Sequence, residues 1–566
     1  MNAFSTAALS LLFCLGTAPL PAGGSPMTRA SLSSSGAEGN GFSYQPSVAA
    51  NGRYVAFVSD AANLVPGDTN GVGDVFVRDL VLGATTRVSV GPGGVQANGY
   101  SRGPALSADG RFVVFESTAT NLDPADATGI LDIFLHDRTT GTTTLLSKNV
   151  IGVPGNDVSA AARISGDGRF VVFHSRAANL VANDTNGSDD VFLVDRALGK
   201  IERVSVSSGG LQADSHCWNP DVDDSGRFVV FDSAAGNLVA GDTNAASDVF
   251  LRDRLAGTTT RISLDRLGRQ VSGTSEAARL AGTGLAISFT SSASTLVPGD
   301  ANNAPDVFVW HGEGNLECAS LTTARVPGNG GNWNAAISKA GDCVVFESSS
   351  TDLVADDLNQ RLDVFVRDLV QGRTLLVSCN HGGAFGNSDS RFAAITGDGR
   401  HVVFSSDSGN LVPGDVNRTT DVFVRDTRPV NSASATTFGL GCNGTAGVPA
   451  LIRSADTLPW FGEVYTLEAR NIPFQASAVL LFGLSRSSWS GLALPFDLTP
   501  IGMPSCALAV SSEVVIPIGA TWSIVIPDSA AVIGAKFFNQ LVVRDPWANV
   551  LGFTVSNAIE STVGGA

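Results

Sequence analysis

The sequence predicts an all-β protein whose larger part is a seven-bladed β-propeller. A short core of Asp, an aliphatic residue and Phe recurs seven times along the chain. Its Asp falls at Asp74, Asp132, Asp190, Asp248, Asp306, Asp363 and Asp421, with spacings of 57 or 58 residues. Another Phe precedes each of these Asp residues by 17 positions, from Phe57 to Phe404. A period this regular indicates a repeat architecture in which each copy is one supersecondary unit.

Each repeat reads as four short antiparallel strands, which is the make-up of a propeller blade. In the second repeat the expected strands are 103–107, 111–116, 132–137 and 143–147, with a long loop at 117–131. Asp109 and Gly110 form the hairpin signal between the first two strands. The strands are apolar on both faces, as in the run FVVF at 112–115. This pattern is expected for blades that stack face to face.

The two ends of the repeat array predict how the ring closes. The last repeat stops after its third strand at 421–426, with no fourth strand behind it. Arg29 precedes Phe57 by 28 residues, just as Arg87 precedes Phe115. The segment 28–32 is therefore expected to supply the fourth strand of the last blade. A ring closed in this way has no open sheet edge.

The turn between the first two strands carries a family resemblance. Segments 107–115 (SADGRFVVF) and 165–173 (SGDGRFVVF) resemble the S-x-D-G-[KR]-x-[IV]-x-F signature of TolB-like propellers, also described as WD40-like or PD40 repeats. The resemblance covers roughly residues 28–427 and weakens in the fifth and sixth repeats, at 282–285 and 340–343. It implies a fold and a binding habit, and it transfers no catalytic residue.

The regions outside the repeats predict export and a second domain. Residues 1–25 have the short apolar core of a signal peptide, although nothing before Arg29 is basic. The expected organisation is a signal peptide at 1–25, a propeller at 26–427, a linker at 428–437 and a β-sandwich at 438–566. Cys442 and Cys506 are the only cysteines of that sandwich and are expected to form a disulfide. The segment 438–442 and the tail at 556–558 resemble a C-terminal module of secreted planctomycete-type proteins.

The net charge and the distribution of apolar residues argue against nucleic acid and against a membrane-spanning segment. The net charge of −17 argues against nucleic acid, because phosphate binding needs a basic face. No run of about 20 apolar residues follows the N-terminus, so no transmembrane segment is expected. The acidic charge fits a cation or basic partner, or simply an exported protein kept in solution by its charge. The protein is expected to be secreted, periplasmic or attached to the cell surface.

The long loop of each repeat contains an acidic pattern that favours calcium. An Asp precedes the core Asp by six residues in all seven repeats, and an Asn follows it two positions later in six of them. Alternating oxygen ligands of this kind begin a calcium loop. The candidate ligands are Asp68, Asn70, Asp74, Asp184, Asn186, Asp190, Asp242, Asn244, Asp248, Asp415, Asn417 and Asp421. The alternative is that these side chains hold the loops as Asx-turns, and the sequence leaves both open.

A second set of charged residues has a structural interpretation. Each of five arginines follows the Gly of the first hairpin turn and is expected to pair with the Asp that ends the third strand of its repeat. The arginines are Arg53, Arg111, Arg169, Arg227 and Arg400, and the acids include Asp79, Asp137, Asp195, Asp253 and Asp426.

No catalytic motif accompanies this fold. The six His residues show no metal-ligand spacing, and the sequence contains no G-x-S-x-G elbow and no phosphate-binding glycine loop. Trp218, Trp310 and Trp333 are candidates for ligand binding, since Trp333 lies among Gly and Asn as in sugar-binding surfaces. The favoured function is a non-enzymatic binding protein for a protein or glycan ligand on the face that carries the long loops. An extracellular hydrolase or lyase with its site in the propeller funnel and a structural cell-surface protein remain as alternatives.

Overall fold

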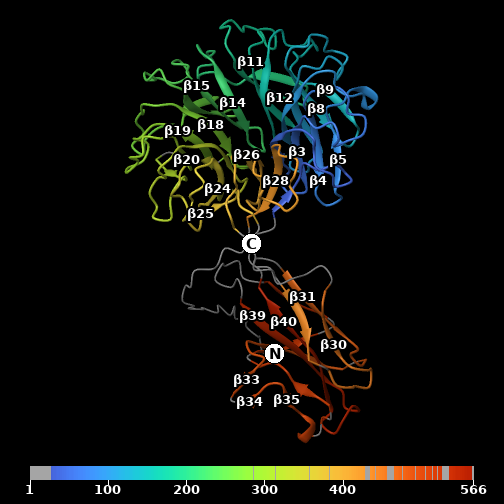
Figure 1. Cartoon of the computed structure of the whole chain (residues 1–566). Helices are drawn as coiled ribbons and strands as arrows, with labels where there is room; N and C mark the ends of the chain where they lie inside the picture. Colours follow the sequence, from blue (N-terminus) through green and yellow to red (C-terminus); the bar gives the residue numbers. More distant parts are fainter. Residues whose placement is uncertain are drawn as a thin grey trace. The chain divides into compact units, whose positions relative to one another are not determined.

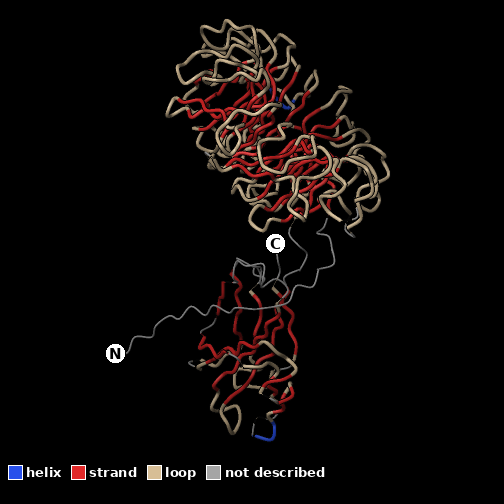
Figure 2. Tube along the Cα trace, turned by 90° about the vertical axis from the view of Figure 1, so that its left-hand side faces the viewer, coloured by secondary structure: helices blue, strands red, loops and turns tan. Residues whose placement is uncertain are grey.

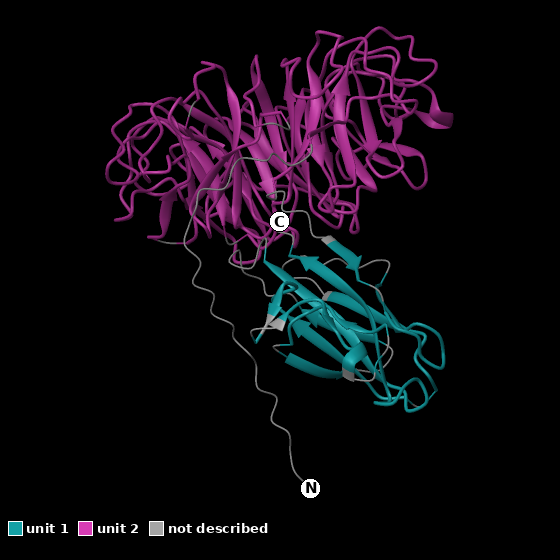
Figure 3. Cartoon of the chain, turned by 60° about the horizontal axis from the view of Figure 1, so that its bottom comes forward, with its two compact units in different colours: residues 1–23, 428–566 teal, residues 24–427 magenta. Residues whose placement is uncertain are grey.

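The computed structural model describes most of the chain in two compact units. Residues 24–427 form one unit, and residues from Arg428 onward belong to the other (Figure 3). The described residues are 27–427 without 285, 313, 356, 381 and 382, and 434–563 without 440, 455–463, 475, 491, 502, 504, 513, 519–520 and 526–534. The predicted signal peptide at 1–25 and the first six residues of the predicted linker lie outside the described residues.

The first unit is a ring of seven four-stranded antiparallel sheets, which confirms the predicted propeller (Figure 1). Blade 1 comprises β2 (Ser43–Val48), β3 (Tyr54–Ser59), β4 (Asp74–Asp79) and β5 (Ala84–Arg87). Blade 2 comprises β6 (Ser101–Leu106), β7 (Phe112–Ser117), β8 (Asp132–Asp137) and β9 (Thr142–Leu145). Blade 3 comprises β10 (Ser159–Ile164), β11 (Phe170–Ser175), β12 (Asp190–Asp195) and β13 (Lys200–Arg203). Blade 4 comprises β14 (Cys217–Val222), β15 (Phe228–Ser233), β16 (Asp248–Asp253) and β17 (Thr258–Arg261).

The remaining blades follow the same plan. Blade 5 comprises β18 (Ser275–Leu280), β19 (Ile287–Ser291), β20 (Asp306–Trp310) and β21 (Leu316–Cys318). Blade 6 comprises β22 (Asn332–Ile337), β23 (Cys343–Ser348), β24 (Asp363–Asp368) and β25 (Arg373–Leu376). Blade 7 comprises β26 (Ser390–Ile395), β27 (His401–Ser406), β28 (Asp421–Asp426) and β1 (Met27–Arg29). A short 3₁₀ turn, η1 (Pro92–Gly94), lies between blades 1 and 2.

Strand β1 closes the ring as the repeat spacing predicts. It pairs antiparallel with β28, with Met27 opposite Arg425 and Arg29 opposite Phe423. The last blade therefore takes three strands from the C-terminal end of the array and one from its beginning. No blade sheet of the ring is left with fewer than four strands.

The recurring phenylalanines form the core of each blade. The second-strand Phe lies directly opposite the third-strand Phe, as Phe57 lies opposite Phe76. Their rings pack with centroids 5.8–6.0 Å apart in all seven blades. Full burial of one such side chain contributes about 1.5–3 kcal/mol. The repeat of Phe residues in the sequence thus corresponds to one Phe pair in the core of each blade.

The arginines after the first hairpin turn pair with the third-strand acids, as predicted. The nitrogen–oxygen distances are 2.6–3.0 Å for Arg53–Asp79, Arg111–Asp137, Arg169–Asp195, Arg227–Asp253 and Arg400–Asp426. Each pair ties the turn after the first strand to the end of the third.

The second unit contains two main sheets. One has the order β29 (Ser434–Phe438), β40 (Phe553–Thr562), β39 (Lys536–Arg544), β32 (Ala478–Gly483) and β37 (Val514–Ile518). The other has the order β30 (Ala450–Arg453), β31 (Val464–Arg470) and β38 (Thr521–Val525). Smaller elements are β33 (Ser488–Trp489), β34 (Leu492–Ala493), β35 (Phe496–Asp497), η2 (Thr499–Ile501) and β36 (Ala507–Leu508).

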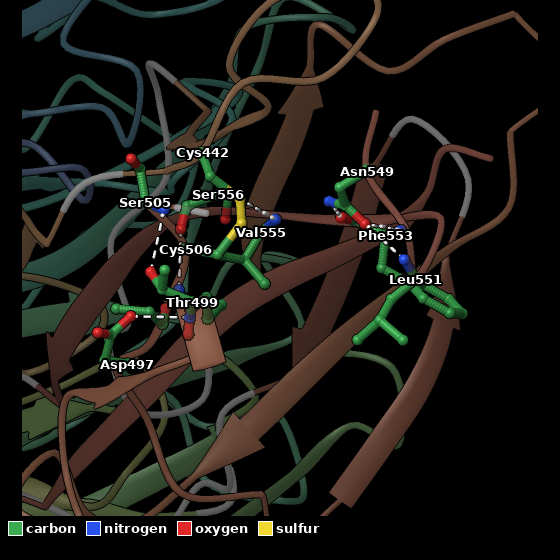
Figure 4. Close-up of a disulfide and its surroundings, with 12 residues drawn as sticks. Cys442, Asp497, Thr499, Ser505, Cys506, Asn549, Leu551, Phe553, Val555 and Ser556 are labelled. Atoms are coloured by element: carbon green, nitrogen blue, oxygen red, sulfur yellow. Dashed lines mark hydrogen bonds between the residues drawn. A yellow bond between two sulfur atoms is a disulfide. The ribbon is translucent and has the colours of Figure 1, made fainter. Parts of the chain in front are cut away.

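Side chains from both sheets share one core, so the unit is a β-sandwich. Leu451 and Tyr465 from the smaller sheet cluster with Leu480, Phe537 and Ile559 from the larger. Cys442 and Cys506 form the expected disulfide (Figure 4). The sequence placed most of β29 in the linker; the structure instead pairs it with β40.

The strand directions fix two faces of the propeller. The connections from second to third strand and from each blade to the next are the long ones, and they share one face, here called the long-loop face. The tight hairpin turns share the other, here called the short-turn face. The tube in Figure 2 shows loops at both ends of the strands of the ring. Among the described residues, no helix has the length and apolar character needed to cross a membrane.

Candidate functional site

The inner strands of the seven blades enclose a central channel. A cavity of about 440 Å³ is lined by residues of the first strand of every blade. This volume lies in the range of small-ligand sites, roughly 300–1,000 Å³. Because every blade contributes one strand, the channel wall consists of seven equivalent strands arranged side by side.

A bulge in each inner strand shapes the channel wall. The register between first and second strands shifts after the second residue of the inner strand, for example between Tyr44 and Ser47. The third residue has positive φ in all seven blades, between 49° and 61°. These residues are Gln45, Gly103, Ala161, Asn219, Ala277, Asn334 and Phe392. A left-handed conformation costs a non-glycine residue about 1–2 kcal/mol, so the ring geometry imposes it even where the residue is not Gly.

The residue types on the channel wall differ between blades, whereas the ring-building residues repeat. The fifth residue of the inner strand is Ser47, Ala105, Arg163, Asp221, Arg279, Ala336 or Ala394. Blades 3, 4 and 5 alone carry charge at this position. A position that varies within an otherwise regular repeat is not needed to build the ring. It is therefore free to serve binding.

Two arginines flank one aspartate on this side of the channel. The carboxylate of Asp221 accepts hydrogen bonds from the backbone N–H groups of Val222 at 3.0 Å and Leu280 at 2.9 Å. Arg163 and Arg279 each donate to the carbonyl of the residue before them, at 3.0 and 2.8 Å. Burial, and then the nearby charge of Arg279, lowers the pKa of Arg163 to about 10. Two guanidiniums and one carboxylate thus lie on this wall, and Glu116 lines the same cavity.

The buried carboxylates around the channel connect neighbouring blades. Backbone N–H groups of the bulge residues Ala161 and Phe392 each donate at 2.6 Å, to Glu116 Oε1 and Glu347 Oε1 respectively. Ala277 N–H donates to Asp232 Oδ1 at 3.2 Å. Burial raises the pKa of Asp232 to about 7. These acids link blades 2 to 3, 4 to 5 and 6 to 7.

Two of the three candidate tryptophans lie near the long-loop end of the channel. Trp218 and Trp333 are the second residues of β14 and β22, and each directly precedes a channel-lining Asn. The Trp218 ring stacks on His216 with centroids 5.2 Å apart. Its indole N–H donates to Asp189 at 3.2 Å.

Trp310 has a different environment from the other two. It ends β20, toward the short-turn face, and packs against the hydrophobic core of blade 5. The structure therefore brings Trp218 and Trp333 to the same end of the ring and places Trp310 elsewhere.

The sequence interpretation missed three channel residues. Arg163 and Arg279 were not singled out, and neither was Phe392, which lines the cavity and remains 43% exposed. Aligning the seven repeats in register would have found them. Arg163 and Arg279 stand where four sister blades have Ser or Ala, and Phe392 stands where the other six blades have Gly, Ala, Asn or Gln.

An arginine lies between the two acids in each loop predicted to bind calcium. In blade 1, Arg87 Nη1 is 3.4 Å from Asp68 and 3.5 Å from Asp74. In blade 4, the corresponding distances from Arg261 to Asp242 and Asp248 are 3.1 and 3.2 Å. Arg203 pairs in the same way with Asp184 and Asp190, and Arg29 with Asp415 and Asp421.

The asparagines of these four loops also act as donors. The side-chain NH₂ groups of Asn70, Asn186, Asn244 and Asn417 donate to the second Asp of their loop at 2.9–3.2 Å. An amide that turns its hydrogens toward the acids is not oriented as a calcium ligand. The geometry of these twelve residues favours the structural alternative that the sequence left open.

The solved structures that this chain resembles match it at low identity and low TM-score. No protein-family model matches the chain, and no curated protein sequence matches it. TolB from Acinetobacter baumannii is 16% identical, with a TM-score of 0.29, over 48% of this chain and 53% of its own, so the match spans about half of that TolB chain. An oligogalacturonate lyase in complex with manganese is 12% identical, with a TM-score of 0.44, over 71% and 92% of the two chains. The β-propeller domain of the Trilobed protease from Pyrococcus furiosus is 12% identical, with a TM-score of 0.43, over 69% and 98%. At these identities and TM-scores the likenesses assign no function to this chain.

Proposed function

We propose that the protein is an exported binding protein that takes an acidic oligosaccharide into the central channel from the long-loop face. The observation that carries this proposal is the pair Arg163 and Arg279 on either side of Asp221, at a strand position where the other four blades have Ser or Ala. Glu116, which also lines the cavity, is paired with Arg102 at 2.7 Å. Two guanidiniums around one carboxylate leave a net positive charge, which a carboxylate group of the ligand would balance. The disulfide of the second unit is compatible with export.

Aromatic groups support a sugar as the rest of the ligand. Phe392 lines the channel with 43% of its surface exposed. Trp218 and Trp333 are half-buried at the long-loop end. Apolar ring faces with convergent polar groups are the usual lining of small-ligand sites.

Binding is favoured over catalysis because the acids at the channel already have structural bonds. Glu116 accepts from Arg102 at 2.7 Å as well as from Ala161. Glu347 and Asp232 accept backbone N–H groups of the next blade. A hydrolase would need a pair of carboxyl groups free to contact the scissile bond.

The test is calorimetric titration of the full-length mature chain with tetragalacturonate, with neutral cellotetraose as the comparison. We expect binding of the acidic sugar that weakens with salt. The double variant R163M/R279M removes both charges and keeps similar length. It should bind about 10- to 100-fold more weakly, given about 1.5–3 kcal/mol for one hydrogen bond to a charged group.

The matched control is R53M, which removes an arginine on the short-turn face outside the channel. It should leave the affinity unchanged. Equal binding of both sugars, or an unchanged affinity in R163M/R279M, would refute the proposal.

A further inference from the structure

Three blades lack the arginine that lies between the two loop acids in the other four blades. The same three blades also differ from the others at a second position. Four blades have an Arg opposite the third-strand Phe: Arg29, Arg87, Arg203 and Arg261. Nine residues later these blades have Glu38, Gln96, Gln212 and Gln270. The other three have Leu145, Cys318 and Leu376 at the first position and Pro154, Pro327 and Phe385 at the second. Both acids of the loop remain in all seven.

In the arginine blades, nitrogen donors fill the space between the acids. Beside the guanidinium, Gln96 donates to Asp68 at 2.7 Å and to Asp74 at 3.1 Å. The same bonds recur from Gln212 to Asp184 and Asp190, both at 2.8 Å. In blades 1 and 3 a positive group and an amide thus balance the two carboxylates, whereas blade 7 has Glu38 at the amide position.

Blade 2 has lost every one of these donors. Leu145 and Pro154 stand at the two positions, and Thr128 replaces the Asn of the loop. The hydroxyl of Thr128 donates to Asp126 Oδ1 at 3.0 Å, and Ser147 donates to Asp132 Oδ1 at 2.6 Å. Asp126 Oδ2 and Asp132 Oδ2 are buried and have no hydrogen-bond partner among the described residues.

The two acids are almost fully buried, at 2% exposure for Asp126 and 0% for Asp132. A buried carboxylate is stable only when it is paired, hydrogen-bonded or neutralised. The apolar Leu145 offers neither a charge nor a hydrogen. A bound cation or a proton must therefore balance the pair.

We propose that Asp126 and Asp132 bind one calcium-type cation in blade 2, in the place that an arginine nitrogen occupies in the sister blades. The ligands are all oxygen, which selects a hard cation. Among the described residues no group of three or more His, Cys, Asp or Glu is arranged to hold a metal. Backbone carbonyls, the Thr128 hydroxyl or water complete the shell. Calcium accepts such an irregular shell, whereas magnesium demands a near-octahedral one and keeps more of its water.

Blades 5 and 6 do not carry the same inference. Both have lost the arginine, but Asn302 and Asn359 still donate to Asp306 Oδ2 and Asp363 Oδ2, at 2.8 and 2.7 Å. Amide hydrogens directed at the second acid compete with a cation there. Among the described residues, blades 5 and 6 each have one buried loop oxygen without a donor, Asp300 Oδ1 and Asp357 Oδ1, whereas blade 2 has two.

The test introduces the two donor residues of an arginine blade into blade 2. The full-length mature protein is freed of metal, and calcium binding is counted by calorimetry and by elemental analysis after dialysis, with magnesium and sodium as separate arms. The variant L145R/P154Q supplies the guanidinium and amide of blade 1 and should fold without metal. We expect it to bind one calcium fewer than the wild type. Its melting temperature should also rise less on addition of calcium than that of the wild type.

The control is D68N in blade 1, where an arginine already stands, and it should leave the calcium count unchanged. Should L145R/P154Q misfold, D126N/D132N gives the same readout, because two neutral amides cannot hold the cation. Equal calcium counts in the wild type and in a folded variant would overturn the proposal. A wild type that binds no calcium would do the same and would indicate that the two acids share a proton.

Discussion

Ser31 donates a hydrogen bond of 2.5 Å from its hydroxyl to Asp421 Oδ1, 390 residues later in the chain. The same bond occurs within single blades, for example from Ser89 to Asp74 at 2.5 Å and from Ser205 to Asp190 at 2.5 Å. The N-terminal segment therefore reproduces the contacts of a fourth strand and of the loop behind it. Ring closure uses the same chemistry as every other blade.

Arg29 should be a major contributor to this closure. Its side chain is 5% exposed and lies 2.7 Å from Glu38 and 3.5 Å from Asp421. R29M leaves buried acids without their cation, which costs about 3–5 kcal/mol. Urea unfolding of the propeller should show this loss. R53M breaks the half-exposed pair with Asp79 and should cost only about 0–1 kcal/mol. Equal losses in the two variants would mean that Arg29 does not hold the ring closed.

Asp232 should make stability fall as the pH rises. Burial raises its pKa in the folded protein from 3.8 to about 7, with a smaller contribution from Glu276. Between those two values the folded state keeps a proton that the unfolded state has released, so stability decreases with rising pH. Melting temperatures measured from pH 4 to 8 should therefore fall less in D232N than in the wild type. Parallel curves would contradict the pKa assignment.

Phe392 should matter for binding and not for stability. Replacing Phe392 with Gly removes the conformational cost of about 1–2 kcal/mol that a non-glycine residue pays in the left-handed region. It also adds about 0.5–1 kcal/mol of backbone entropy cost on folding. F392G should thus unfold within about 1 kcal/mol of the wild type and bind tetragalacturonate more weakly. The matched control is F346A, a fully buried Phe whose loss should cost about 3–5 kcal/mol. Unchanged affinity in F392G would remove Phe392 from the proposed site.

The disulfide should stabilise the second unit alone. Cys442 and Cys506 are 64 residues apart. A loop of this length corresponds to about 4 kcal/mol in the chain-entropy model. Calorimetry of C442S/C506S should show a lower melting temperature for the second unit and an unchanged melting temperature for the propeller. C217S is the control, because Ser occupies that position in most sister blades and bonds to the second-strand Ser, as in the 2.9 Å contact of Ser43 with Ser59. A shift of both transitions would show that the disulfide also supports the propeller.

Much of the fold could be predicted because the repeat encodes contacts within a blade and between neighbours. The spacing of Phe57 and Asp74 predicted the paired strands of a blade, and the position of Arg29 predicted the closing strand. The turn arginines were predicted as partners of the third-strand acids. In the second unit β29 was missed, because Ser, Ala and Thr between Pro429 and Phe438 resemble a linker until β40 provides a partner.

The sequence by itself determined the seven blades, their closure, the turn ion pairs and the Cys442–Cys506 disulfide, since each follows from a local pattern or a constant spacing. Only the tertiary structure decided which side chains meet at the channel. Arg163 and Arg279 are brought to one wall by the ring, since each blade contributes one strand to a common axis. It also decided that Arg87 and its equivalents fill the acidic loops, because that contact depends on the register between the third and fourth strands. Where Leu145 replaces the arginine, the same register leaves Asp126 Oδ2 and Asp132 Oδ2 without a hydrogen-bond partner among the described residues.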